Sequence, residues 1–231
     1  MNEYKMLFNI VKLSIKTKSG KSSIGTSFFY KVERKGIERN LLITNKHVLE
    51  DAIEITFFLH TSFEKPGSIR KLTMSGENLM SVSTFHPYNQ DLCAIDVTNY
   101  IKSEDKFYSL NSDYLLIEED QELKKIVENV YIIGYPEGLE DVINKLPVIT
   151  VGTTASSLSI NYNGDSLIML NAFSMPGSSG SPVFVERDGR KLLIGLIVGL
   201  SLDNLERPIY NLSYAIKSNS IVELEKQVVG D

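Results

Sequence analysis

Short runs of alternating apolar and polar residues follow one another along most of the chain. Residues 11–16 and 158–162 are two such runs, and a period of two places one strand face on a core and the other in water. Turn-forming pairs lie between runs, as in Asn163-Gly164, Asp188-Gly189 and Lys35-Gly36. These residues tolerate the positive φ of tight hairpins. The pattern therefore predicts many short antiparallel strands, which is typical of a barrel or a sandwich.

Helical patterns are few. A short helix is expected over residues 121–128. The segment Ser220-Ile-Val-Glu223 has the form of a capping box and predicts a C-terminal helix that continues into Val229. A polar stretch near the middle of the chain reads as a linker. We therefore expect two β units joined by that linker, with units over residues 1–110 and 121–231 and the linker over residues 102–120.

Composition limits the classes of function. The chain has 231 residues, 42% of them hydrophobic, which is enough for a sizeable core. It carries 24 basic and 29 acidic residues, for a net charge of −5, with no basic run longer than two. No nucleic acid partner is expected, because such partners need a basic surface.

Cys93 is the single cysteine of the sequence, so no intrachain disulfide can form. The longest apolar run near the start is Met6-Leu-Phe8, which is too short for a signal peptide or a membrane span. We therefore expect a soluble cytoplasmic protein with no membrane partner.

Three segments carry side chains of types that can take part in catalysis. His47 follows the apolar run Leu41-Leu-Ile43, and Asp91 stands where a loop enters another apolar run. Gly177-Ser-Ser-Gly-Ser-Pro182 packs small residues directly before Val183-Phe-Val185. Each has an ordinary explanation on its own, as a structural histidine, a turn aspartate or a flexible loop.

Histidine, aspartate and serine together can form a site for nucleophilic catalysis. A serine hydroxyl is a poor nucleophile until a neighbouring base takes its proton, and that base needs an acceptor to fix its tautomer. The developing oxyanion also needs backbone N–H donors. A Gly-x-Ser-Gly loop can supply them, because glycine adopts conformations that a side chain would block.

These segments resemble the motifs of the chymotrypsin-like serine peptidases. Thr44-Asn-Lys-His-Val-Leu49 is similar to their histidine motif, especially in the bacterial high-temperature-requirement branch, and Asp91-Leu-Cys-Ala-Ile-Asp-Val97 to that branch's aspartate motif. Gly177-Ser-Ser-Gly-Ser-Pro182 resembles the Gly-Asp/Asn-Ser-Gly-Gly-Pro nucleophile motif. The order and spacing match, and weaker similarities extend the resemblance over nearly the whole chain, at residues 25–28, 130–136, 148–152 and 214–219.

The resemblance implies an all-β fold of two packed six-stranded antiparallel β-barrels with a C-terminal helix, and an active site in the cleft between them. The first barrel would carry His47, the general base, and Asp91, which orients it. The second would carry the nucleophile Ser179, and the amides of Gly177 and Ser179 would form the oxyanion hole. The implied reaction is hydrolysis of a polypeptide through an acyl-enzyme, with no cofactor and no metal.

The resemblance also implies a primary specificity pocket. In this family the pocket is lined by the residue six before the nucleophile and by two later strand segments, which gives Phe173, Val198 and Leu200. None of them is charged, so a substrate Lys or Arg would be buried unpaired. An apolar residue of small or medium size is expected just before the cut.

Other residues compete for these roles. Only Ser179 takes the serine position of the motif frame Gly177-x-Ser-Gly180, and an offset of five from Asp91 places Asp96 on the opposite strand face. The remaining rivals read as structural: Ser178, Ser181, His60, His86 and Cys93.

The sequence departs from the family motif at two positions. Ser181 replaces the second glycine, and Ser178 replaces the aspartate that binds a freshly cut N-terminus in trypsin-like zymogens. Activation by N-terminal cleavage is therefore not expected. No peptide-binding module follows the fold, so the caged oligomers of the high-temperature-requirement enzymes are not expected either.

Two kinds of function remain open. The first is an active endopeptidase, restricted inside the cell by a selective cleft, a regulatory protein partner or a resting loop. The second is a catalytically silent binding or scaffold protein. An α/β-hydrolase is disfavoured, because it requires the serine before the acid and the histidine in the chain.

Overall fold

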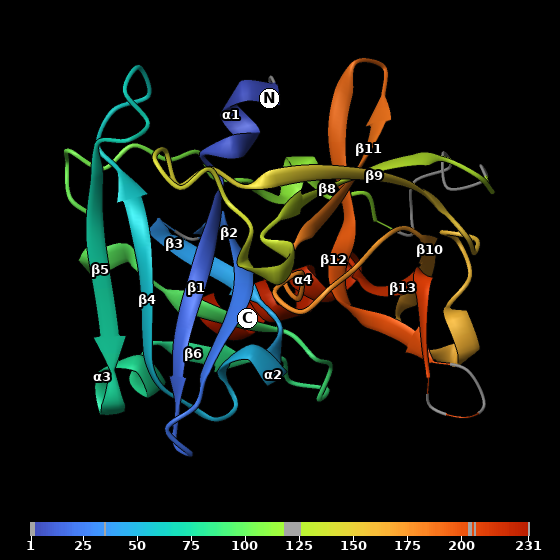
Figure 1. Ribbon diagram of the computed structural model, residues 1–231, viewed down its shortest axis with the longest axis horizontal. Helices are drawn as coiled ribbons and strands as arrows, with labels where there is room; N and C mark the ends of the chain where they lie inside the picture. The colour runs from blue at the N-terminus through green and yellow to red at the C-terminus, as the bar shows by residue number, and fades with distance from the viewer. Residues whose placement is uncertain (1–2, 35, 118–125, 203–204, 206, 231) are drawn as a thin grey trace.

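The computed structural model describes residues 3–34, 36–117, 126–202, 205 and 207–230. Two β units lie side by side, and the chain fills the first before it enters the second (Figure 1). This confirms the expected all-β double-barrel fold with a C-terminal helix. Within the described residues, none of the helices combines the length and apolar character that crossing a bilayer requires.

The first unit is an antiparallel sheet of seven strands in the order β5-β4-β1-β2-β3-β7-β6. Its strand count and closure differ from the expected six-stranded closed barrel. The edge strand β6 pairs with β7, and the other edge β5 pairs with β4, while helix α3 (Gly76–Ser81) occupies the chain between the two edges. The strands are β1 (Ile10–Thr17), β2 (Ser22–Arg34), β3 (Ile37–Thr44), β4 (Ala52–His60), β5 (Ile69–Ser75), β6 (Ser83–Phe85) and β7 (Cys93–Asp96).

The second unit is a closed barrel in the order β10-β13-β12-β11-β8-β9. The predicted hairpin at Asp188-Gly189 is confirmed, since these residues have φ of 47° and 72° and join two paired strands. The strands are β8 (Asn129–Gly134), β9 (Val148–Thr154), β10 (Leu167–Asn171), β11 (Pro182–Arg187), β12 (Arg190–Leu202) and β13 (Pro208–Lys217).

The strand expected over residues 158–162 is wrong. Leu158 is buried, but Ile160 on the same predicted face is exposed. The hydroxyls of Ser157 and Ser159 bond to each other, and the 3-10 turn η5 (Tyr162–Gly164) follows. Local side-chain bonds of this kind compete with strand pairing.

The linker crosses from one unit to the other. Leu110 bridges to Tyr30 of β2, and Leu115 bridges to Leu193 of β12. The first five residues of the helix expected over 121–128 lie outside the described residues. The 3-10 turns of the described chain are η1 (Thr98–Tyr100), η2 (Ser112–Tyr114) and η4 (Pro136–Gly138), in addition to η5.

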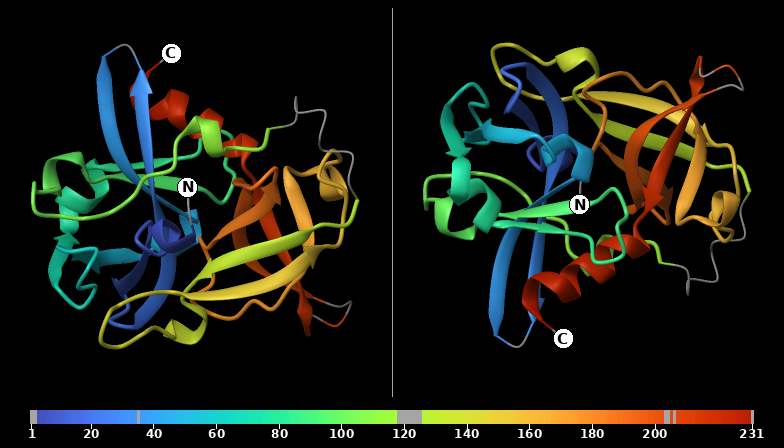
Figure 2. Two further views of the ribbon diagram at one scale, coloured as in Figure 1. Left: turned by 90° about the horizontal axis from the view of Figure 1, so that it is seen from above. Right: turned by 90° about the horizontal axis from the view of Figure 1, so that it is seen from below.

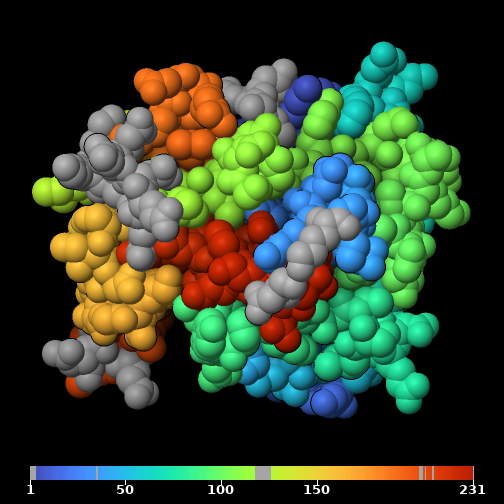
Figure 3. All heavy atoms as spheres, turned by 180° about the vertical axis from the view of Figure 1, so that it is seen from behind, coloured from blue at the N-terminus to red at the C-terminus, as the bar shows by residue number. Residues whose placement is uncertain are grey.

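Helix α4 (Asn219–Val229) confirms the predicted C-terminal helix, although its N-cap is Ser218 and not the expected Ser220. Ile221 and Leu224 of α4 enter the apolar core that both units share. Figure 2 shows α4 running from the barrel toward the β2–β3 hairpin, and Figure 3 shows it at the surface between the two units. The short helices α1 (Glu3–Leu7) and α2 (Lys46–Leu49) complete the described helices.

The first unit contains a buried ion pair between Arg70 and Asp105. The Asp105 side chain is fully buried and receives two hydrogen bonds from the Arg70 guanidinium and one from the Lys102 amide. Burial by itself would raise the pKa of Asp105, but these bonds hold that pKa below its usual value.

Candidate active site

His47 and Asp91 form a two-point contact. The ring Nδ1 of His47 lies 2.6 Å from Asp91 Oδ2, and the backbone N–H of His47 donates to Oδ1 at 2.8 Å. A carboxylate can only accept, so it holds the ring proton on Nδ1 and leaves Nε2 free as a base. The His47 side chain is 45% exposed, so this base is accessible.

The strand register produces this contact. β3 and β7 pair so that Thr44 lies opposite Cys93. Continuing this antiparallel register beyond both strand ends brings Asp91 beside the first turn of α2, which contains His47. The Asn45 side chain fixes the approach, because its Nδ2 donates to the Asp91 carbonyl at 2.8 Å.

The Asp91 carboxyl is poised to stay ionised. Partial burial would raise its pKa, but the ring and backbone hydrogen bonds from His47 outweigh burial and lower that pKa below its usual value. Asp91 is therefore negative at neutral pH and stabilises positive charge on the imidazole.

Ser179 lies on a rigid turn between the two units. The N–H of Thr26, from β2, donates to the Ser179 carbonyl at 2.8 Å, and the Gly180 N–H donates to the Ile197 carbonyl of β12 at 2.9 Å. Gly180 has φ of 86°, and a Cβ there would lie 2.0 Å from the Thr26 carbonyl oxygen. No larger residue fits at this position without displacing the turn.

The same turn presents two amides without acceptors. The Pro176 carbonyl accepts from Glu137 N–H at 2.6 Å, and the Ser178 carbonyl accepts from Ser181 N–H at 2.9 Å. Because N–H and C=O point opposite ways across a trans peptide, the amides of Gly177 and Ser179 face away from these contacts. Neither amide donates to an acceptor within the described part of the chain. Both are available to bind an oxyanion.

The Ser179 hydroxyl occupies a specific resting position. It donates to the Val198 carbonyl of β12 at 3.0 Å, and none of the hydrogen bonds among described residues joins it to His47. The turn nevertheless lies next to the histidine segment, because Thr26 contacts both. Its N–H bonds to the Ser179 carbonyl, and its carbonyl accepts from the hydroxyl of Thr44 at 2.8 Å. Thr44 lies three residues before His47. Rotation about χ1 of Ser179 would release the hydroxyl from Val198.

The rival acids and bases have other partners. Asp96 pairs with Arg39 at 3.2 Å and accepts from the Thr98 amide. His60 is buried, and its Nδ1 lies 2.8 Å from the Pro66 carbonyl oxygen.

His86 is also buried, with Nε2 2.9 Å from Glu223 Oε2 of α4. The same loop is tied to α4 a second time, because the Ser220 hydroxyl donates to the Gln90 side-chain oxygen. His86 and Gln90 flank Asp91 on the N-terminal side, so α4 holds the loop that carries this carboxylate.

The neighbouring serines and the cysteine are structural. Ser178 accepts from the Met175 amide at 3.2 Å, and the buried Ser181 hydroxyl occupies space that a Cβ on Gly134 would fill. Burial raises the pKa of the Cys93 thiol, which keeps it protonated.

The residues expected in the specificity pocket are not gathered around one described cavity. Phe173 is 49% exposed, so it does not turn into the barrel core. Val198 lines a cavity together with Asp91, and that lining includes neither Phe173 nor Leu200. The assignment of Phe173, Val198 and Leu200 to one pocket stays a prediction.

Two supporting residues were not assigned a role from the sequence. Thr26, within the Gly-Thr-Ser-Phe segment, holds both the Ser179 carbonyl and, through its hydroxyl at 2.8 Å, the Gly177 carbonyl. Asn45, two residues before His47, holds the Asp91 loop. Their nearness to the motifs was the available signal.

Comparison with known proteins yields one family match and several similar structures. The model of the trypsin-like peptidase domain matches residues 25–196. The active form of the Rv3671c protease from M. tuberculosis has a TM-score of 0.56 at 14% identity, over 97% of this chain and 82% of that one. The MamO protease domain from Magnetospirillum magneticum has a TM-score of 0.58 at 12% identity, over 94% and 96%. An inactive serine-to-alanine mutant of Rv3671c is similar at a TM-score of 0.57 and 14% identity, over 100% and 92%. At these identities the structural similarities establish the fold.

Proposed function

Because this chain belongs to the trypsin-like peptidase domain family, we propose that it is a serine endopeptidase with Ser179 as nucleophile, His47 as general base and Asp91 as the orienting acid. The observation that carries the proposal is the two-point contact between Asp91 and His47, which leaves Nε2 as the free base. The turn of Ser179, with its two unpaired amides, supports it.

The proposed reaction proceeds in two halves. Nε2 of His47 takes the hydroxyl proton as Ser179 Oγ attacks the peptide carbonyl carbon, and the amides of Gly177 and Ser179 stabilise the oxyanion. The C–N bond then breaks as the imidazolium gives the proton to the leaving amine. Water attacks the acyl-enzyme with its proton passing to Nε2, and Ser179 leaves with that proton.

The remaining parts of the proposal come from the sequence. The motifs place the chain nearest the bacterial high-temperature-requirement branch, and they imply a polypeptide substrate. A cytoplasmic location and restriction by a regulatory protein partner are further parts of it. Cell fractionation and affinity capture on the protein with Ser179→Ala test these two points.

One observation favours a second candidate, a silent binding or scaffold protein. The Ser179 hydroxyl donates to the Val198 carbonyl and not to His47. If the hydroxyl never leaves this partner, the chain keeps the fold and binds polypeptides without cleaving them. The proposed enzyme needs this single side-chain rotation before each turnover.

A fluorophosphonate probe separates the two candidates. Such probes react with a serine that is activated by its base, so we expect one adduct, on Ser179, by intact and peptide mass spectrometry. Ser179→Ala should lose the adduct and all turnover of a peptide library, by about six decades. Ser181→Ala is the matched control and should still react. No adduct on the folded wild-type protein, together with no turnover, would support the binding protein.

A further inference from the structure

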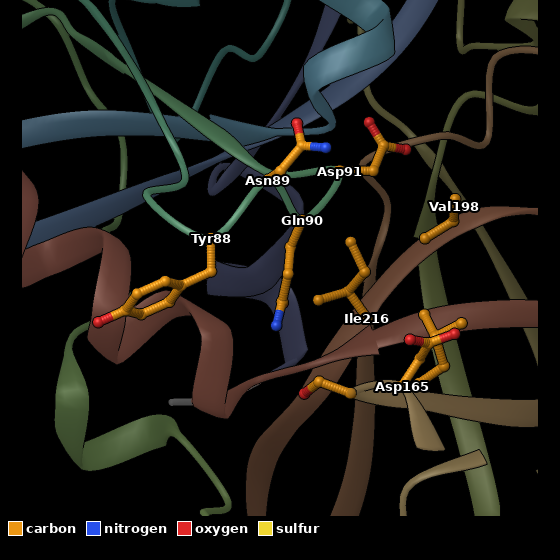
Figure 4. A pocket seen from close by; sticks show the side chains of 9 residues that line it. Tyr88, Asn89, Gln90, Asp91, Asp165, Val198 and Ile216 are labelled. Atoms are coloured by element: carbon orange, nitrogen blue, oxygen red, sulfur yellow. The ribbon is translucent and has the colours of Figure 1, made fainter. Parts of the chain in front are cut away.

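A cavity of about 310 Å³ lies beside the proposed triad, between the Asp91 loop and the barrel. Asp91 lines it from one side, and Val198 and Ile216 of two barrel strands line it from the other (Figure 4). Leu167 of a third barrel strand is also part of the lining. Val198 also accepts the Ser179 hydroxyl through its carbonyl. One lining residue, Asp91, therefore contacts the proposed base, and another, Val198, contacts the proposed nucleophile.

The lining combines an apolar wall with acidic groups. Ile216 is buried in the core between the units, and Leu167 and Val198 pack against that core. Of the described residues that line the cavity, the two charged ones are both acidic, Asp91 and Asp165.

Asp165 is the carboxylate without a partner. Asp91 is already engaged by His47, whereas the Asp165 side chain forms no hydrogen bond or ion pair in the described part of the chain. The Asp165 residue is exposed at the edge of the cavity. An exposed, unpaired carboxylate can meet a ligand cation without a large desolvation cost.

The other polar groups do not cancel this charge. Gln90 accepts from the Ser220 hydroxyl through its side-chain oxygen, and Figure 4 shows its amide nitrogen extending toward the centre of the view. Two cations adjoin the lining in the described part of the chain, and both bond to other groups: the Lys46 ammonium bonds to Asn89 Oδ1 at 2.8 Å, and the Lys217 ammonium bonds to Asn161 Oδ1 at 2.7 Å. Figure 4 shows the Asn89 amide directed away from Asp165.

We propose that this cavity is a substrate subsite for a lysine or arginine side chain, with Asp165 as the specificity-determining residue. The aliphatic stem would lie on the wall of Val198, Leu167 and Ile216, and the charged head would reach Asp165 at the rim. Long basic side chains bind in this way, with an apolar stem and a solvated head. This proposal rests on the proposed peptidase function, and it concerns a position other than the apolar residue expected just before the cut.

The test is a positional-scanning peptide library with wild-type protein and Asp165→Asn. The wild type should prefer lysine or arginine over the apolar isostere norleucine at one position within about four residues of the cut. Asp165→Asn should lower the ratio of kcat/KM for lysine over norleucine at that position by about 1.5- to fivefold, the range of one exposed ion pair. Asp165→Lys should shift the preference to glutamate, and high salt should weaken the wild-type preference.

Asp188→Asn is the matched control. Asp188 lies in the β11–β12 hairpin outside this cavity, and asparagine tolerates its positive φ equally. Its library profile should equal that of the wild type. A wild-type profile with no basic preference, or an Asp165→Asn profile with an unchanged lysine ratio, overturns the subsite.

The fluorophosphonate probe keeps the two proposals apart. An adduct on Ser179 without a basic preference refutes the subsite and leaves the peptidase standing. If no adduct forms and no peptide is cleaved, the peptidase proposal fails. Binding of fluorescent lysine and norleucine peptides to the wild type and to Asp165→Asn then decides the subsite, because equal affinities in all four combinations overturn it.

Discussion

Replacing Asp91 with asparagine should disable His47 without disturbing the fold. The carboxylate accepts two hydrogen bonds, from the ring Nδ1–H and from the backbone N–H of His47. An amide can satisfy only one of them with its oxygen. If the oxygen stays on the backbone N–H, the amide NH₂ faces Nδ1 and drives the ring proton to Nε2, where the ring can no longer accept the proton of Ser179.

The magnitude follows from these two contacts. Reversing the amide to keep the correct tautomer leaves two donors facing each other at the backbone N–H, which costs about 1–2 kcal/mol for a partly exposed group. Loss of the charge-assisted bond to the imidazolium adds about 1.5–3 kcal/mol. At 1.36 kcal/mol per decade, the sum is two to almost four decades of kcat. Such a substitution in a serine-peptidase triad costs about four decades, so we expect the upper end of this range for Asp91→Asn.

The assay is kcat/KM on a peptide that the wild type cleaves, with enzyme concentration set by total protein and the fold of each variant checked by circular dichroism. Asp96→Asn is the matched control, because Asp96 is bonded to Arg39 and to the Thr98 amide, and the His47 ring has no contact with it. It should retain activity within about tenfold. If Asp91→Asn kept a tenth of wild-type activity, or if Asp96→Asn were the more impaired, the assignment of the triad acid would be refuted.

Three further predictions concern the elements that support the site. Gly180→Ala should abolish labelling of Ser179, because the new Cβ would clash with the Thr26 carbonyl and displace the turn. Circular dichroism should still report the β fold, and an active variant would contradict the rigid turn. Glu223→Gln weakens the contact of α4 with His86, and so loosens the loop that carries Asp91. We therefore expect kcat to fall severalfold with little change in KM. A fall in kcat accompanied by an equal rise in KM would argue for a general loss of fold. Asp105→Asn should lower the free energy of unfolding by about 3 kcal/mol at pH 7 in urea titrations. The folded pKa of Asp105 is depressed, so its contribution is present above the unfolded pKa and is lost as pH falls through the folded one. The gap between wild type and variant should therefore narrow steadily as the pH falls below the ordinary aspartate pKa, and a constant gap would contradict this.

Much of the candidate site could be predicted from the sequence, because each functional residue stands in a local element with its own signal, although the contacts between those elements are long-range. His47 directly follows a strand, Asp91 precedes one, and Ser179 lies in a turn whose glycines fix its shape. The resemblance to the serine-peptidase motifs then implied the three roles. The specificity pocket was less accessible, because Phe173 and Leu200 belong to loops and strand ends whose side-chain directions depend on packing.

The sequence by itself determined the strand over residues 11–16, the hairpin at Asp188-Gly189 and the C-terminal helix, since periodicity and turn chemistry act over a few residues. Tertiary structure decided features that depend on distant partners. The strand expected over residues 158–162 did not form, because serine hydroxyl bonds and a 3-10 turn replaced pairing. The Ser179 hydroxyl rests on Val198 only because two separate barrel segments meet there, and Asp165 faces the Asp91 loop only because the two units pack together. Contacts of this kind are set by the summed packing of both units, which no local pattern in the sequence records.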